Sequence, residues 1–393
     1  MTKYKKYIGY LLIFLGLIIV VIVLYKNSEY SRINRTFSSK DMLTSSWEKY
    51  KNQFIQNGRV IDFSANNITT SEGQSYGMLR SVWIDDKSEF DSLWSWTEKN
   101  MKRPNDNLFG WKWGKTGSGY GFIENGGINS ASDADTDIAL ALIFASKRWN
   151  DANYMSQAKN ILSSLWTLDT ATVSGKMYVT GGNWAKTNGQ VIINPSYFAP
   201  YAWRIFAKVD PRHDWNSLVG PAYDLLNKSG QANLGGKTGI GLPPDWLALD
   251  SSGNIVTPVE GNLDSNYSFD AMRVPWRITL DYEWNKDKRA YDYLNNNYNK
   301  LKYTWQAIHK ISGSYTYDGQ VLIPAEKPSM YGTALGYFFV TDEPVAKKIY
   351  EQKILSLYSS AANDFDKRLP YYDQNWLWFG AGLYNHYLVD LSK

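Results

Sequence analysis

Apolar residues recur at helical spacing along most of the chain. In the stretch SSWEKYKNQFI, Trp47, Tyr50 and Phe54 lie three and four positions apart, as expected for one face of a helix. Ser45, followed by Glu48, predicts a capping box at the start of this helix. The same spacing predicts further helices over residues 71–84, 88–101, 133–149, 153–168, 196–209, 214–229, 268–284, 287–306, 329–341, 343–359 and 373–388.

Alternating strand patterns are rare, and the clearest is GKMYVTGG at residues 175–182. About twelve helices in series favour an all-α domain of helical hairpins, which would close as six hairpins in a ring. No Pro- or Ser-rich linker divides residues 44–393, so we expect one domain there. The segments 102–131, 170–195 and 230–267 are long loops rich in Gly, Asn and Trp, and long loops on a rigid scaffold usually carry function.

The N-terminal part of the chain is different. Residues 8–24 are almost entirely apolar, close to the ~20 residues that a membrane-spanning helix needs. Lysines precede this run, and no small-residue cleavage site follows it. We therefore predict a cytoplasmic stub and uncleaved transmembrane signal anchor over residues 1–26, and a spacer over residues 27–43. A single-pass protein of the cell membrane would then hold its catalytic domain outside the cytoplasm.

The composition excludes several classes of site. The 393 residues contain no cysteine and three histidines, none in a metal-binding arrangement, so we expect no disulfide, no metal and no cofactor. The net charge of +4 is spread along the chain without a basic run, so we expect no nucleic-acid partner. The 17 Trp and 29 Tyr fit either a large core or a cleft of flat rings for sugars.

Three acidic residues, Glu72, Asp133 and Asp270, fall at the starts of predicted helices. Acids are common there because they complement the helix dipole, so position alone indicates no chemistry. The neighbours are less ordinary: Gly73 follows the first acid, and glycine is a poor helix former. The second acid forms a like-charge pair with Asp137 four residues on. Broken local rules of this kind are expected at functional sites.

Paired carboxyl groups are the requirement of glycoside hydrolysis. One must be protonated to donate to the leaving oxygen, and the other must be ionised. A glutamate at a helix N-terminus should have a lowered pKa, but a second carboxylate nearby would raise it again. Glu72 would meet this requirement if Asp133 lay beside it.

The segments TSEGQSYGM, SASDADTDIALAL, NPSYF and FDAMRV resemble, in this order, the motifs of glycoside hydrolase family 8. The resemblance extends from about residue 44 to residue 388 and is closest to the endo-β-1,4-glucanases associated with bacterial cellulose synthesis. It implies an (α/α)6 barrel with a long cleft and an inverting mechanism.

The resemblance also implies roles for single residues. Glu72 matches the general acid, Asp133 a residue that binds and distorts the sugar at the −1 subsite, and Asp270 the general base. Arg273 is expected among the substrate-binding residues and to help keep the base ionised. An aspartate at the base position argues against chitosan as substrate. The family commonly has Tyr before the base, where this chain has Phe269, so activity or substrate preference is expected to differ.

Aromatic residues are the remaining candidates for substrate binding. Trp111 and Trp113 alternate in FGWKWG, which favours a stacking platform, and Tyr197, Tyr371 and Tyr372 sit at matching family positions. Two further tryptophans and two further acids fit structural roles equally well or better: Trp184, Trp246, Asp135 and Asp137.

We therefore predict a membrane-anchored, inverting endo-β-1,4-glucanase that hydrolyses cellulose-like exopolysaccharide. Its expected partners are a β-glucan, the membrane and an exopolysaccharide synthase complex. Two alternatives stay open: a mixed-linkage β-glucanase or xylanase on the same fold, and a catalytically weak glucan-binding protein.

Overall fold

A computed structural model describes residues 16, 18, 40–260 and 263–393 of the chain. Within this part, no helix is both long enough and apolar enough to cross a membrane. The predicted transmembrane helix, of which only residues 16 and 18 are described, and most of the predicted spacer lie outside the described residues. The membrane anchor therefore stays a prediction.

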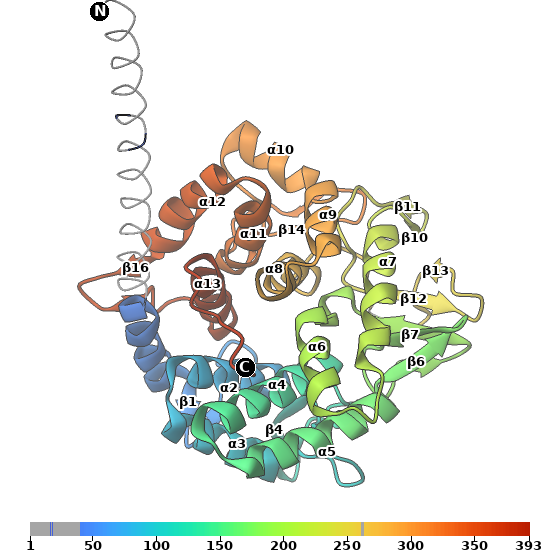
Figure 1. Cartoon of the computed structure of the whole chain (residues 1–393), viewed down its shortest axis with the longest axis vertical. Helices are drawn as coiled ribbons and strands as arrows, with labels where there is room; N and C mark the ends of the chain where they lie inside the picture. Colours follow the sequence, from blue (N-terminus) through green and yellow to red (C-terminus); the bar gives the residue numbers. More distant parts are fainter. Residues whose placement is uncertain (1–15, 17, 19–39, 261–262) are drawn as a thin grey trace, which may run out of the picture.

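Thirteen α-helices in the described part of the chain form an inner and an outer ring (Figure 1). The first helix covers residues 40–54. The others are α2 (Ser71–Ile84), α3 (Lys87–Met101), α4 (Ser132–Trp149), α5 (Ala152–Leu168), α6 (Pro200–Val209), α7 (Val219–Ser229), α8 (Val274–Asn285), α9 (Lys288–Asn296), α10 (Asn299–Ile308), α11 (Pro328–Thr341), α12 (Glu343–Ile349) and α13 (Tyr371–Tyr384). Helices α2, α4, α6, α8, α11 and α13 form the inner ring. This arrangement agrees with the predicted (α/α)6 barrel.

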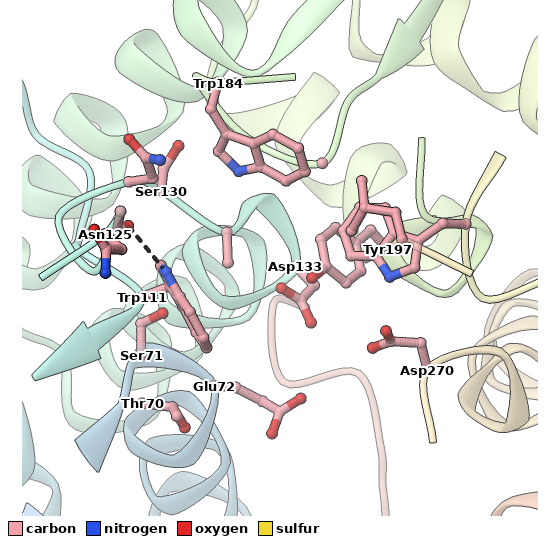
Figure 2. Close-up of a pocket in the computed structure, with 16 residues that line it drawn as sticks. Thr70, Ser71, Glu72, Trp111, Asn125, Ser130, Asp133, Trp184, Tyr197 and Asp270 are labelled. Atoms are coloured by element: carbon pink, nitrogen blue, oxygen red, sulfur yellow. Dashed lines mark hydrogen bonds between the residues drawn. The ribbon is translucent and has the colours of Figure 1, made fainter. Parts of the chain in front are cut away.

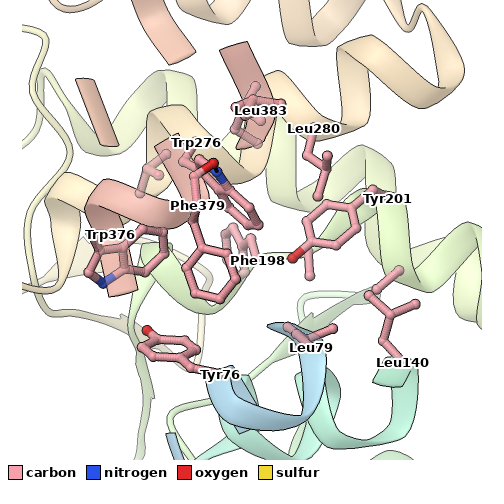
Figure 3. Packing of buried hydrophobic residues seen from close by; sticks show 14 of the residues in the cluster. Tyr76, Leu79, Leu140, Phe198, Tyr201, Trp276, Leu280, Trp376, Phe379 and Leu383 are labelled. Atoms are coloured by element: carbon pink, nitrogen blue, oxygen red, sulfur yellow. Dashed lines mark hydrogen bonds between the residues drawn. The ribbon is translucent and has the colours of Figure 1, made fainter. Parts of the chain in front are cut away.

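The interior of the inner ring is filled by side chains (Figure 3). Aromatic rings from three inner helices meet there: Phe379 lies 5.3 Å from Tyr76 and 5.4 Å from Trp276, measured between ring centroids. Because each inner helix faces this core on one side and the outer ring on the other, α4 buries every residue from Ser132 to Ala145.

Glycines let two inner helices touch. A Cβ atom on Gly332 of α11 would lie 2.1 Å from the carbonyl oxygen of Trp376, and one on Gly380 of α13 would lie 2.3 Å from that of Gly332. Only a residue without a side chain permits this approach. The ring closes between α2 and α13, where Arg80 donates a hydrogen bond to Asn375 at 3.0 Å.

The long loops contain more strand than the sequence predicted. Seventeen strands, none longer than five residues, are described: β1 (Ile55–Gln56), β2 (Arg59–Val60), β3 (Thr69–Thr70), β4 (Lys112–Thr116), β5 (Gly119–Phe122), β6 (Thr170–Val173), β7 (Lys176–Val179), β8 (Lys186–Thr187), β9 (Gln190–Ile193), β10 (Asn233–Leu234), β11 (Lys237–Thr238), β12 (Leu247–Asp250), β13 (Ile255–Val256), β14 (Ser314–Tyr315), β15 (Val321–Ile323), β16 (Tyr358–Ser359) and β17 (Asp364–Phe365). All pair in antiparallel register, and the largest sheet has the order β13-β12-β9-β8. Strands this short have too few positions to show an alternating pattern.

Several predicted helix boundaries were wrong. Residues 40–54 are already helical before Ser45, so Ser45 is not the N-cap, and part of the predicted spacer is helical. The predicted helix over residues 287–306 is two helices, because Tyr298 between them adopts a left-handed conformation with φ of 61°. The helix predicted over residues 343–359 ends as an α-helix at Ile349 and continues in π and 3-10 turns.

Candidate active site

A cleft of about 360 Å³ lies where α2 and α4 begin (Figure 2). The three long segments that were predicted to carry function all contribute to its lining: Trp111 and Ser130 from the first, Trp184 from the second, and Trp246 and Leu263 from the third. The cleft is thus built from loops on one scaffold of inner helices.

The three predicted carboxylates meet in this cleft. Glu72 and Asp133 are the second residues of α2 and α4, and Asp270 immediately precedes the 3-10 turn η3 (Ala271–Arg273) that leads into α8. All three line the cleft, and Figure 2 shows their side chains around a common space. Helix α2 is capped by Thr70, whose hydroxyl accepts a hydrogen bond from the Gly73 N–H at 3.0 Å. The Glu72 side chain is therefore not needed to cap this helix.

One buried guanidinium joins the three acids. Nη1 of Arg273 donates to Glu72 and, at 3.0 Å, to Asp133, while Nη2 donates to Asp270 and, at 2.8 Å, to the Ser196 hydroxyl. The Arg273 side chain is 1% exposed, against 22% for Glu72 and 33% for Asp270. The acids therefore face the cleft, and the buried guanidinium of Arg273 lies behind them.

A second buried arginine supports the first. Arg277, one helical turn on, binds both carboxylate oxygens of Asp137 at 3.0 and 2.8 Å and donates to the Tyr201 hydroxyl at 2.6 Å. The like-charge pair of Asp133 and Asp137 on α4 thus has one arginine for each acid. Asp137 has the hydrogen-bonding role that the sequence favoured.

The surroundings of Glu72 suit a proton donor. Burial, together with the negative charges of Asp133 and Asp270, raises the pKa of Glu72 to about 7, although the Arg273 guanidinium opposes the shift. Burial also raises the pKa of Asp270, against the same guanidinium. Near neutral pH, Glu72 is therefore a carboxyl group that can hold a proton, which agrees with the expectation that a neighbouring acid raises its pKa.

Four aromatic side chains give the cleft flat walls. Trp111 is 39% exposed, and its indole N–H donates to the Gly126 carbonyl at 3.0 Å, which fixes the ring (Figure 2). On the opposite side, the Trp246 ring lies 5.8 Å from Trp184 and 5.6 Å from Tyr197. Flat apolar surface with polar edges is suited to sugar rings.

The model of Glycosyl hydrolases family 8 matches residues 23–379 of the chain. The chain belongs to this family. It is 30% identical over 345 residues to Endoglucanase C of Ruminiclostridium cellulolyticum, a match that covers 84% of this chain and 69% of that protein. Among solved structures, the endo-1,4-D-glucanase of Vibrio fischeri ES114 is similar with a TM-score of 0.70 at 26% identity, over 86% of this chain and 94% of that one. A β-1,3-1,4-glucanase from Paenibacillus sp. X4 shares the fold, with a TM-score of 0.73 at 21% identity over 89% of this chain and 92% of that one.

Membership of family 8 makes the chain a glycoside hydrolase, as the resemblance of its motifs predicted. A catalytically weak glucan-binding protein, the second alternative that the sequence left open, would have no need of all three carboxylates. Glu72, Asp133 and Asp270 are all present and converge on one space, as hydrolysis by paired carboxyl groups requires.

Trp113 does not line the cleft of this family 8 hydrolase, although the sequence favoured it as part of a stacking platform. Its indole is stacked on Tyr120 at 5.3 Å, meets the edge of Trp96 at 5.0 Å and lies 4.7 Å from the Arg59 guanidinium. These neighbours cover its faces. The ring belongs to the packing between the β4–β5 hairpin and α3.

Tyr371 and Tyr372 begin α13 and also lie outside the cleft lining. The Tyr371 hydroxyl is 3.5 Å from Glu72 and donates to it, so this residue contacts the acid. The Tyr372 hydroxyl donates to the main-chain carbonyl of Phe269, next to Asp270. Both side chains therefore contact the segments that bear Glu72 and Asp270, whereas the sequence predicted contact with the sugar.

The sequence reading did not assign Trp184 and Trp246 to the site, because an isolated tryptophan in a loop carries no signal that separates a core role from a cleft role. Their place in long Gly- and Asn-rich segments was the available hint. Among the described residues, no group of His, Cys, Asp and Glu side chains is arranged to hold a metal ion.

Proposed function

We propose that this family 8 hydrolase is an inverting endo-β-1,4-glucanase, with Glu72 as general acid, Asp270 as general base and Asp133 as a ligand of the sugar at the cleavage point. The observation that carries the proposal is the convergence of these three carboxylates on one buried guanidinium, Arg273, in an indole-walled cleft. The names of the endoglucanases that the chain resembles support the choice of substrate.

The reaction needs one proton given and one proton taken. Protonated Glu72 donates to the glycosidic oxygen as the bond from that oxygen to the anomeric carbon breaks, which leaves Glu72 ionised. Ionised Asp270 accepts a proton from a water molecule as the water oxygen bonds to the anomeric carbon from the opposite face, so the configuration inverts. Proton exchange with solvent then restores both groups.

Arg273 serves both partners in this scheme. Its guanidinium stays charged throughout, because arginine does not deprotonate in proteins. The charge stabilises Glu72 after it has lost its proton and keeps Asp270 ionised before the reaction, while Asp133 remains paired with Nη1. One cation thus holds three acids in a fixed arrangement.

We further propose that residues 8–24 anchor the enzyme in the cell membrane and that its substrate is a cellulose-like polysaccharide exported there, beside the synthase complex. The apolar run and the lysines before it support this location. Mass spectrometry of membrane-extracted protein should find the N-terminal segment intact. A mature N-terminus between Asn27 and Thr44 would contradict the anchor without affecting the proposed chemistry.

An assay on several polymers tests the proposed activity. The full chain should cleave soluble β-1,4-glucan with a higher kcat/KM than mixed-linkage β-glucan, xylan or chitosan, and viscosity should fall before many reducing ends form, as expected for internal cuts. The variants Glu72→Gln and Asp270→Asn serve as controls and should lose this activity. Faster cleavage of xylan or mixed-linkage glucan would favour the alternative substrates.

A further inference from the structure

Asp245 lies directly behind the segment that bears the proposed base. It precedes Trp246, which lines the cleft, but is itself only 6% exposed. Its Oδ1 atom accepts three main-chain hydrogen bonds, from the N–H groups of Ser268 at 3.2 Å, Asp270 at 3.2 Å and Ala271 at 2.6 Å. One buried oxygen of Asp245 thus binds three main-chain N–H groups of residues 268–271, the segment that bears the proposed base.

These N–H groups belong to the start of a helical stretch, where main-chain donors have no partner within the helix. The Asp245 carboxyl oxygen supplies an acceptor for them from a distant part of the chain. Burial and the nearby charge of Asp270 raise the pKa of Asp245 well above its ordinary value, so the cap depends on an oxygen acceptor and not on a full negative charge. The side chain of Asp270 occupies the usual capping position before η3 but makes no capping bond. Because Asp245 takes that role, the Asp270 carboxylate remains free to face the cleft.

Two further contacts tie the same region. The Asp245 N–H donates to the Asn266 carbonyl at 2.7 Å, which fixes Asp245 against the residues that lead to Asp270. From the other side, the Tyr372 hydroxyl donates to the Phe269 carbonyl. Residues 268–271 are therefore held through their main chain on two sides.

We propose that Asp245 is a positioning residue for the general base: its carboxylate fixes the main chain from which Asp270 reaches water and substrate. This inference rests on the proposed role of Asp270. A displacement of the base by about 1 Å is enough to lower the rate by about 100-fold, even though no group that touches substrate has been removed.

Three variants test this role. Asp245→Ala removes the acceptor, whereas Asp245→Asn keeps an oxygen that can accept the same N–H groups. Asp250→Ala is the matched control: Asp250 is a nearby carboxylate whose Oδ1 caps the N–H groups of Ser252 and Asn254 at 2.9 Å in an exposed turn. All three are compared with wild type in kcat, KM and melting temperature on soluble β-1,4-glucan.

We expect Asp245→Ala to lower kcat by about 10- to 100-fold with KM changed less than about threefold, since the base and not the sugar-binding wall is displaced. Asp245→Asn should recover most of kcat, and Asp250→Ala should match wild type. Equal losses in Asp245→Asn and Asp245→Ala, or a loss confined to KM, would overturn the proposal. Wild-type kcat in Asp245→Ala would also overturn it. If Asp245→Ala does not fold, Asp245→Ser replaces it, because the shorter side chain cannot accept from the same three N–H groups: a lowered kcat with unchanged KM supports the role, and wild-type kcat contradicts it.

A double variant separates this inference from the proposed function. If Asp245 acts through the base, adding Asp245→Ala to Asp270→Asn should cause no further loss in the residual activity on an activated aryl glycoside. Additive losses would reject the positioning role while leaving Asp270 as base. Wild-type activity in Asp270→Asn alone would instead reject the proposed function.

Discussion

At the scale of the residue, the protonation of Glu72 governs the proposed chemistry. Its pKa of about 7 arises from burial and from two neighbouring acids, with Arg273 opposing. A general acid must be protonated, so kcat/KM should fall as pH rises above about 7, close to tenfold per pH unit. Glu72→Gln should lose this alkaline limb together with most activity on cellulose, while aryl glycosides with good leaving groups are partly spared. A wild-type profile that stays flat to pH 9 would contradict Glu72 as the acid.

Trp111 and Trp113 form a matched pair for testing the wall of the cleft. Trp111→Ala removes an exposed indole from the lining and should raise KM for the polymer, by the equivalent of ~0.5–1.5 kcal/mol. Trp113→Ala should leave KM unchanged and lower the melting temperature instead, because this ring packs on Tyr120 and Trp96. Equal effects on KM would contradict the placement of Trp113 outside the cleft.

Sequence reasoning identified the three carboxylates but did not place Arg273 as the partner that all three share. Glu72, Asp133 and Asp270 were found because each falls at the start of a predicted helix and within a motif that resembles family 8. Gly73 and Asp137 were additional local signals for the first two. Arg273 was found by its distance from the base, yet its burial behind all three acids depends on α2, α4 and α8 meeting, which no local pattern records. Asp245 and Trp246 carried no local signal for the same reason.

At the scale of the element, prediction succeeded where a helix has its own signals. α2 begins after the Thr70 cap and ends at Asp85 in a left-handed conformation, and both of its bounds match the sequence prediction. The break at Tyr298 was missed because left-handed backbone at a tyrosine has no sequence signature. The hairpins in the loops were missed because strands of two to five residues are stabilised by neighbours that are distant in sequence.

Two buried acids, Asp135 in α4 and Asp169 directly after α5, are close enough for the charge of Asp169 to raise the pKa of Asp135. Asp135 accepts from the Phe109 N–H at 3.0 Å, and Asp169 accepts from the hydroxyl of Ser130, a cleft residue, at 2.9 Å. The other carboxylate oxygen of each has no hydrogen-bond partner within the described residues. Burial raises the pKa of Asp135 well above its ordinary value and that of Asp169 to about 7, although Ser130 and Arg103 oppose the shift at Asp169.

This pair predicts a pH dependence of stability. The folded state holds a proton on Asp169 that the unfolded chain releases above about pH 4, so this residue's contribution to the free energy of unfolding falls as pH rises from about 4 to about 7. Asp169→Asn removes this titration. Its free energy of unfolding should therefore increase relative to that of wild type as pH rises, by ~1–3 kcal/mol at pH 8. Denaturant unfolding of both proteins at pH 5 and pH 8 measures the difference. If the two proteins differ in free energy of unfolding by the same amount at both pH values, Asp169 is not the group that titrates.

At the scale of the whole molecule, the ring of hairpins places the proposed catalytic residues at the starts of inner helices. Helical periodicity was enough to predict the all-α class and about twelve helices, whereas the (α/α)6 barrel was implied by the resemblance to family 8. The contact at which the ring closes, between Arg80 in α2 and Asn375 in α13, was not predictable because it joins residues separated by most of the chain. The packed interior confines chemistry to the loop-lined end of the ring, where the cleft lies (Figures 2 and 3).

The stereochemistry of cleavage tests the central claim most directly, since it distinguishes a base that activates water from a nucleophile that bonds to the sugar. Proton NMR should follow wild-type enzyme acting on a soluble β-1,4-glucan oligosaccharide, early enough to precede mutarotation. We predict that the first reducing end to appear is the α-anomer, as an inverting pair of Glu72 and Asp270 requires. The β-anomer appearing first would contradict the inverting mechanism and the role of Asp270 as general base.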